Sequence, residues 1–224
     1  MLVSIIIPVY NEAKTISEVL SELLNLGIDK EVILVDDGST DFKYQQGVFL
    51  DPRISIIRHS RNRGKGAALR TGLAAAKGDL AVFFDADMEY RPEDILALTN
   101  ALSTGSHSVC YGSRFLGKSR FYPLNYLANR LITKLTSLST GLRLTDVETG
   151  MKAFNKAIFD RIKLMEDGFA IEIEVTIKLA KAGYQIQEVP IDYCARNRKQ
   201  GKKITWFDGI KALIAILRYG ITKQ

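Results

Sequence analysis

The stretch LAVFFDADMEYRPED, residues 80–94, decides the fold class of this chain. Its first five residues are apolar without a break, which is typical of a strand buried on both faces of a parallel sheet. The apolar run ends in two carboxylates one residue apart, Asp85 and Asp87. Pro92 then stands where a helix would begin, with acidic residues in its first turn. The stretch therefore predicts one strand–loop–helix unit of an α/β protein.

The same unit recurs around this stretch. Further strands are expected at 2–10, 31–36, 53–59 and 107–114, and helices at 15–26, 66–76 and 92–102. Regular alternation of strand and helix predicts a Rossmann-like, mostly parallel sheet flanked by helices. Ligands of such sheets bind beyond the carboxyl ends of the strands, where this sequence places its polar turns.

The second half of the chain is less regular. Helices are expected at 125–138, 171–182 and 206–219, a short strand within 146–156, and one strand over 184–196. Because no linker separates the halves, we expect a single domain over residues 1–224.

The composition favours an anionic partner. The chain has 224 residues, a net charge of +6 and a pI of about 9.2. Cys110 and Cys194 form no CxxC motif, which suits a reducing, cytoplasmic location. No run approaches the roughly 20 apolar residues of a spanning helix, so peripheral rather than integral membrane contact is expected. The basic clusters lack the aromatic pattern of RNA binders, and we expect no nucleic-acid partner.

Asp85 and Asp87 suit a hard cation. Two carboxylates at i and i+2 past a strand end can face one Mg²⁺, which takes one or two protein carboxylates beside waters and phosphates. Such a cation neutralises charge on a diphosphate leaving group. Glu89, two residues further on, is a candidate third ligand. An isolated pair of this kind is more often a surface turn, but here a buried strand delivers it to the binding edge.

Two other turns carry weaker signals. In VDDGSTD, residues 35–41, Asp36 and Asp37 suit contacts to a nucleobase or ribose, or an Asx turn before a helix. In NRGKGAALRTG, residues 62–72, glycines before a helix let backbone N–H groups approach a phosphate, and Lys65 adds a charge. The spacing matches neither a P-loop nor a dinucleotide-binding signature.

Six motifs in order carry a resemblance over nearly the whole chain, from Ser4 to about Lys203. They are PVYNE (8–12), VDDGSTD (35–41), NRGKGAA (62–68), DADMEYRPEDI (85–95), YGSRF (111–115) and DVETGMKAF (146–154). Together they resemble the inverting family 2 glycosyltransferases of GT-A fold, and among these the dolichyl- and polyprenyl-phosphate mannose synthases and glucosyltransferases. Residues 1–115 would then form the nucleotide-sugar-binding half, and residues 116–224 the acceptor-binding half with a C-terminal amphipathic helix.

The resemblance implies roles for individual residues. It places Pro8, Tyr10, Glu12, Asp36 and Asp37 in the nucleoside pocket, with Lys65, Asp85 and Arg114 as further donor contacts. It assigns Asp85, Asp87 and Glu89 to Mg²⁺ or Mn²⁺, although mannose synthases of the family commonly carry Gln at the Glu89 position. It brings Asp146 and Glu148 to the sugar and acceptor, and it sets Arg196, Lys202 and Lys203 on the donor diphosphate and acceptor phosphate. The catalytic roles fall to Asp87, Asp146 and Arg196.

The implied reaction moves mannose or glucose from GDP-mannose or UDP-glucose to a polyprenyl or dolichyl phosphate. A phosphate monoester is largely dianionic at pH 7, so it is a nucleophile that needs little help from a base. This agrees with the two histidines, His59 and His107, which we expect at the surface or at strand edges. A sugar hydroxyl acceptor would instead require a carboxylate base, and Asp146 is the candidate.

The last expected helix has an apolar face directly after the basic run RNRKQGKK, residues 196–203. This face comprises Trp206, Phe207, Ile210, Leu213, Ile214 and Leu217. A basic run beside an apolar helix suits an anionic membrane surface, whereas packing on the sheet would explain the apolar face equally well.

Two alternatives remain open. One keeps the fold and donor but uses a soluble acceptor, such as a phosphorylated metabolite or a growing polysaccharide. The other is a basic, peripheral membrane-binding module without catalysis, against which the intact DAD and ETG motifs count.

Overall fold

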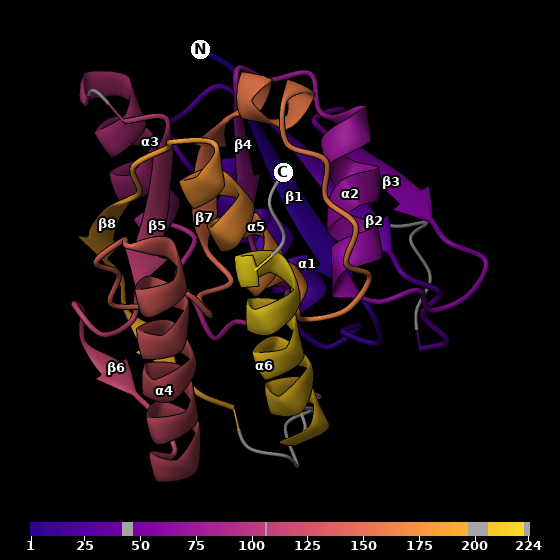
Figure 1. Ribbon diagram of the computed structural model, residues 1–224. Helices are drawn as coiled ribbons and strands as arrows, with labels where there is room; N and C mark the ends of the chain where they lie inside the picture. Colours follow the sequence, from indigo (N-terminus) through magenta and orange to yellow (C-terminus); the bar gives the residue numbers. More distant parts are fainter. Residues whose placement is uncertain (42–46, 106, 197–205, 222–224) are drawn as a thin grey trace.

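The computed structural model describes residues 1–41, 47–105, 107–196 and 206–221. A seven-stranded sheet runs through it in the order β3-β2-β1-β4-β7-β5-β8 (Figure 1). Neighbouring strands are parallel except at β7, which runs antiparallel to both β4 and β5. The strands are β1 (Val3–Val9), β2 (Lys30–Asp36), β3 (Ile54–Arg58), β4 (Leu80–Phe83), β5 (Val109–Ser113), β7 (Lys152–Asn155) and β8 (Gln187–Pro190). The predicted mostly parallel α/β sheet is confirmed.

Helices cover both faces of the sheet because its central strands are apolar on both sides. Ile5 and Ile7 of β1 pack towards α1 (Ile16–Asn25) and α3 (Asp94–Thr104). Ile6, between them, packs in a second cluster with α2 (Lys65–Ala75) and α5 (Ile171–Lys181). Two short 3₁₀ helices, η1 (Gly47–Leu50) and η2 (Lys156–Asp160), complete these layers.

Two further helices form an outer layer on α5. Ile132 of α4 (Pro123–Thr140) and Ile216 of α6 (Trp206–Ile221) share a core cluster with Ile173 and Ile177 of α5. Figure 1 shows α4 and α6 lying side by side. Within the part of the chain that the structure describes, no helix has the length and apolar character needed to cross a membrane.

The prediction of one continuous strand over 184–196 is wrong. The chain leaves the main sheet after Pro190, which has no N–H to donate to the ladder. Tyr193–Cys194 then form β9, which pairs with β6 (Ser119–Arg120) in a separate two-stranded sheet. This change of direction brings Tyr193 to the carboxyl edge of the large sheet, where the site lies.

Candidate active site

A cavity of about 330 Å³ opens at the carboxyl ends of the strands, where the sequence predicts the ligand site. Both halves of the chain contribute to its wall. Among its lining residues are Pro8, Tyr10, Glu12, Asp37, Lys65, Asp85, Asp87, Glu89, Tyr90, Arg114, Glu148, Glu172, Tyr193 and Arg196. Of the predicted site residues, Asp36 and Asp146 lie outside this lining, and Lys202 and Lys203 lie outside the described residues.

Asp85 lies two residues beyond the end of β4 and faces a lysine. Its Oδ1 lies 2.8 Å from the Nζ of Lys65, at the start of α2, and its Oδ2 lies 3.0 Å from the same atom. The Oδ2 atom fits only because residue 150 is glycine: a Cβ there would lie 2.0 Å away. The ETG motif therefore leaves the room that the DAD motif needs.

Asp87 and Glu89 face an arginine from the far end of the chain. The Arg196 guanidinium lies 3.1 Å from Asp87 Oδ2 and 2.9 Å from Glu12 Oε2. Its backbone N–H donates to Glu89 Oε1 at 2.7 Å, and the Tyr193 hydroxyl donates to Glu89 Oε2 at 2.7 Å. The predicted nucleoside-pocket residue Glu12 thus lies against the predicted metal ligands.

Burial, together with the crowding of acids, raises the pKa of two carboxyl groups in the cavity. Burial, with the nearby carboxylates of Glu89 and Asp85, raises the pKa of Asp87 to about 7, and Arg196 only partly opposes this. Burial, with the charge of Glu172 second, raises the pKa of Glu148 to about 7. The acidic side chains that line the cavity outnumber its lysine and arginine side chains.

The three predicted metal ligands suit a divalent cation by their chemistry. All offer carboxylate oxygens, the ligands of Mg²⁺, to one cavity. The raised pKa of Asp87 reflects burial and repulsion between carboxylates, and a bound cation would reduce that repulsion. They are not gathered as a cluster, since no three His, Cys, Asp or Glu side chains of the described residues are placed to hold a metal. Lys65 and Arg196 provide the positive charge at these carboxylates instead.

Asp37 organises the loop before α2. Its carboxylate accepts hydrogen bonds from the backbone N–H groups of Arg63 and Gly64, the latter at 2.7 Å. It also lies 2.6 Å from Nδ1 of His59, whose Nε2 lies 2.9 Å from the Thr71 hydroxyl. His59 follows the edge strand β3, as expected, but its side chain is buried rather than at the surface. Asp37 therefore shapes the wall that Gly64 and Lys65 form.

Asp36 lies deeper than its neighbour. Its side chain is fully buried, accepts from the Ser39 backbone N–H at 2.7 Å, and lies 3.2 Å from Nε of Arg58. These contacts match the Asx-type turn that the sequence offers as the alternative reading. A direct contact of Asp36 to a nucleoside stays a prediction.

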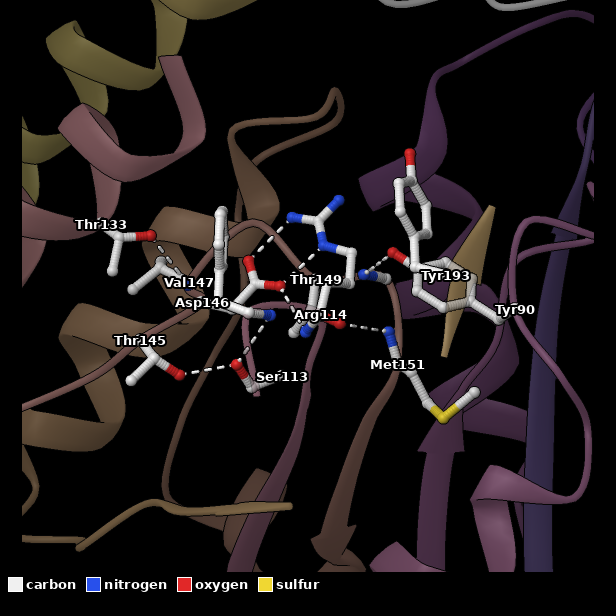
Figure 2. Close-up of polar contacts among 12 residues, drawn as sticks. Tyr90, Ser113, Arg114, Thr133, Thr145, Asp146, Val147, Thr149, Met151 and Tyr193 are labelled. Atoms are coloured by element: carbon white, nitrogen blue, oxygen red, sulfur yellow. Dashed lines mark hydrogen bonds and ion pairs between the residues drawn. The ribbon is translucent and has the colours of Figure 1, made fainter. Parts of the chain in front are cut away.

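Arg114 lines the cavity, and Asp146 holds its guanidinium in place (Figure 2). The Arg114 Nε lies 2.6 Å from Asp146 Oδ2 and the Arg114 Nη2 lies 2.7 Å from Asp146 Oδ1. This is a bidentate ion pair between two buried side chains. The guanidinium also lies 5.1 Å from the centre of the Tyr193 ring. Glu188 in turn accepts from the backbone N–H of Asp146 at 2.9 Å. Asp146 thus holds Arg114 and does not face the cavity as a free base.

Sequence reasoning missed Tyr193, Glu172 and Lys152. Tyr193 is missed because the single strand expected over 184–196 would keep it in the main sheet, whereas it lies in β9. Glu172 reads as an ordinary acidic residue in the first turn of α5, yet it lies 3.0 Å from Lys65. Lys152 reads as a polar residue in a strand, yet it is fully buried against Glu172. A lysine between apolar neighbours in GMKAF is the one available signal.

Comparison with known proteins agrees with this geometry. The sequence model of glycosyl transferase family 2 matches residues 4–163. A dolichol-phosphate mannosyltransferase of Pyrococcus furiosus is 30% identical over 214 residues, which cover 90% of this chain and 59% of the relative. A UDP-N-acetylglucosamine–dolichyl-phosphate N-acetylglucosaminyltransferase of Methanococcus voltae is 32% identical over 213 residues, covering 85% of this chain and 84% of the relative. The chain thus spans little more than half of the P. furiosus protein.

Solved structures share the fold. Glucosyl-3-phosphoglycerate synthase of Mycobacterium tuberculosis superposes with a TM-score of 0.75 at 21% identity, over 100% of this chain and 82% of that one. The same synthase in complex with Mn²⁺, UDP and phosphoglyceric acid gives a TM-score of 0.74 at 21% identity, covering 100% of this chain and 80% of that one. The GT-A fold predicted from the sequence is confirmed, and the chain belongs to glycosyl transferase family 2.

Proposed function

We propose that this chain transfers a hexose, with inversion, from a nucleoside diphosphate sugar to a polyprenyl phosphate, with the help of a divalent cation. The observation that carries the proposal is the charge pattern of the cavity. The carboxylates of Asp85, Asp87 and Glu89 line the cavity and form what we call its acidic wall, and a buried arginine, Arg114, lines the same cavity. Such a site suits two phosphate-bearing substrates meeting over a cation.

The acidic wall suits the donor. A divalent cation at Asp85, Asp87 and Glu89 would neutralise charge on the diphosphate as it leaves. Pro8 and Tyr10 line the cavity beside Asp37, where a nucleoside can lie against the end of β1. Lys65, in the first turn of α2, lines the cavity and can offer its ammonium to a phosphate.

The basic groups suit the acceptor. A phosphate dianion needs no general base, which fits a site where Asp146, the base expected for a hydroxyl acceptor, is committed to Arg114. Arg114 and Arg196 both line the cavity and offer it fixed positive charge. They work by bringing two anions together rather than by moving a proton.

The acceptor class is supported by the relatives, whose names specify dolichol phosphate. It is also supported by the outer helices. Both leave large apolar side chains exposed next to basic ones: Leu124, Leu127, Leu131 and Leu138 near Arg130 and Lys134 of α4, and Phe207, Ile210, Leu213, Ile214 and Leu217 near Lys211 and Arg218 of α6. The inner face of α6 packs on α4 and α5, so packing explains the buried apolar residues of this helix but not the exposed ones. We propose that the outer faces contact an anionic membrane surface.

The test is a transfer assay. Protein with Mg²⁺ or Mn²⁺ meets labelled UDP-glucose or GDP-mannose and a polyprenyl phosphate in detergent, and the label is followed into the organic phase. Transfer should stop with chelator and in Asp87→Ala, and should persist in Asp160→Ala, which removes an exposed aspartate of η2.

Each outcome has a consequence. Lipid-linked label that depends on the metal and on Asp87 supports the proposal. Donor hydrolysis without a lipid product would favour a soluble acceptor for the same fold. No consumption of either donor would favour a binding module without catalysis.

A further inference from the structure

A line of alternating charges runs from the cavity into the core of the protein. It begins at Asp85 and passes through Lys65 and Glu172 to Lys152. Side-chain exposure falls along it, from 23% to 11%, 5% and 0%. The first three members line the cavity proposed for the donor, whereas Lys152 lies outside that lining.

Lys152 is the unexpected member. It lies on β7 in the middle of the sheet, opposite Phe83 of β4 and Tyr111 of β5. Its ammonium contacts Glu172 and the Thr149 carbonyl, and lies 4.8 Å from the centre of the Tyr111 ring. A buried ion pair adds little stability compared with apolar residues of the same size. The pair therefore invites an explanation other than stability.

Glu172 binds two lysines, one through each oxygen. Oε2 contacts Lys152, and Oε1 lies 3.0 Å from Nζ of Lys65. The backbone of Glu172 is tied down as well, because its carbonyl accepts from the Thr176 hydroxyl at 2.8 Å. Lys152 thus holds one oxygen of Glu172 and leaves the other as an ion-pair partner of Lys65.

Lys65 has two carboxylate partners with different freedom. Asp85 is partly exposed and lies where a cation would engage it, whereas Glu172 is buried and held by Lys152. The Lys65 ammonium lies 2.8 Å from Asp85 Oδ1 and 3.0 Å from Glu172 Oε1, so it has a carboxylate on two sides. If Asp85 turned to another cation, Glu172 would keep the Lys65 ammonium in place.

We propose that Glu172 and Lys152 are positioning residues that hold the Lys65 ammonium in the cavity as a contact for the donor diphosphate. The inference rests on the proposed function, since it requires a nucleoside diphosphate at this wall. Without Glu172, Lys65 would have Asp85 as its remaining carboxylate partner in this line of charges, and would compete there with the incoming cation.

The test measures binding rather than turnover. UDP and GDP, each with Mn²⁺, are titrated calorimetrically into the wild type and into the double variant Glu172→Gln/Lys152→Met. The double variant removes one charge of each sign, so the net charge is unchanged, and its urea midpoint should stay near that of the wild type. The nucleotide should nevertheless bind about ten-fold more weakly, the scale of one lost contact to a charged group.

A second background separates positioning from packing. Lys65→Met alone should weaken binding by a similar factor, and adding the double substitution to it should cause no further loss. An equal further loss would show that Glu172 and Lys152 act independently of Lys65, and would overturn the inference. Lys30→Met, which removes a buried lysine of β2 outside the cavity lining, is the matched control and should leave binding unchanged.

Failure of the inference differs from failure of the function. If the wild type binds a nucleotide and the double variant binds it equally well, the positioning role is wrong while the donor site stands. If the wild type binds neither nucleotide, the donor site is wrong and the inference is lost with it.

Discussion

Gly150→Ala is the sharpest perturbation of the site that the structure offers. A Cβ at this position would lie 2.0 Å from Oδ2 of Asp85 and 3.3 Å from Cε2 of Tyr90. The backbone of Gly150 is outside the left-handed region, so alanine is penalised only by these contacts. The change therefore tests the position of one carboxylate and little else.

The displacement follows from the distances. Because a Cβ essentially never approaches another heavy atom closer than 3.0 Å, Asp85 Oδ2 must move by at least 3.0 − 2.0 = 1.0 Å. A shift of this size would disrupt the ion pair with Lys65, whose Nζ lies 2.8 Å from Asp85 Oδ1 and 3.0 Å from Asp85 Oδ2. A misplacement of about 1 Å costs on the order of 100-fold in rate. Because the Asp85 side chain is partly exposed and can turn, stability should fall by only about 1 kcal/mol, the low end for overpacking.

The assay compares two glycine-to-alanine variants. Gly27→Ala is the control, because its Cβ would meet nothing within 4 Å and its backbone is also outside the left-handed region. Initial transfer rates and urea unfolding are measured for both. Gly150→Ala should lose about 100-fold in rate with a nearly unchanged unfolding free energy. A rate within about two-fold of the control would refute the reasoning, and a loss of stability of about 3 kcal/mol or more would attribute the effect to folding.

Three further predictions concern charge and surface. Burial raises the folded-state pKa values of Asp87 and Glu148 to about 7, above their values in the unfolded chain. Both groups therefore bind protons more tightly in the folded state, and the free energy of unfolding falls as pH rises from about 4 to about 7. Mn²⁺ should therefore raise the thermal midpoint, followed by scanning fluorimetry, more at pH 8 than at pH 5; an equal rise at both would contradict this. Asp146→Asn leaves the Arg114 charge buried and unpaired, and should lower the unfolding free energy in urea by about 3–5 kcal/mol; a loss below about 1 kcal/mol would show that the pair is not needed. Leu217→Ser, at a side chain 63% exposed, should weaken sedimentation with anionic vesicles roughly ten-fold while changing stability by less than about 0.5 kcal/mol; unchanged sedimentation would remove α6 from the proposed membrane contact.

The turns that line the cavity were predictable because the sequence pattern of each turn and the rule for ligand sites in parallel sheets indicate the same edge of the sheet. The apolar run before Asp85 and Asp87 identifies a buried strand, and strand ends of a parallel sheet share one edge. The glycines before α2 and the acidic turn after β2 follow the same logic. In the structure these turns do line one cavity, and their role as the ligand site stays a prediction.

The supports of the site were not predictable in the same way. Glu172 and Lys152 are separated by 20 positions in sequence and act through contacts that only packing creates. Asp146 is recognisable as an acid in a turn, but its contact with Arg114 joins the loop after α4 to the loop after β5. Pro190 marks the end of a strand only when one knows that the next residues join another sheet.

The reversed strand β7 has a consequence for how the molecule is assembled. Both neighbours of β5 in the sheet, β7 and β8, come later in the chain, and β7 is also the second neighbour of β4. A fragment ending at Phe115 would leave β5 with no strand beside it and β4 with an open, apolar edge, which is a template for aggregation. We therefore expect no autonomous folding unit within residues 1–115, and one cooperative unfolding transition for the whole chain. The two substrates would then meet in a sheet that neither half can build alone.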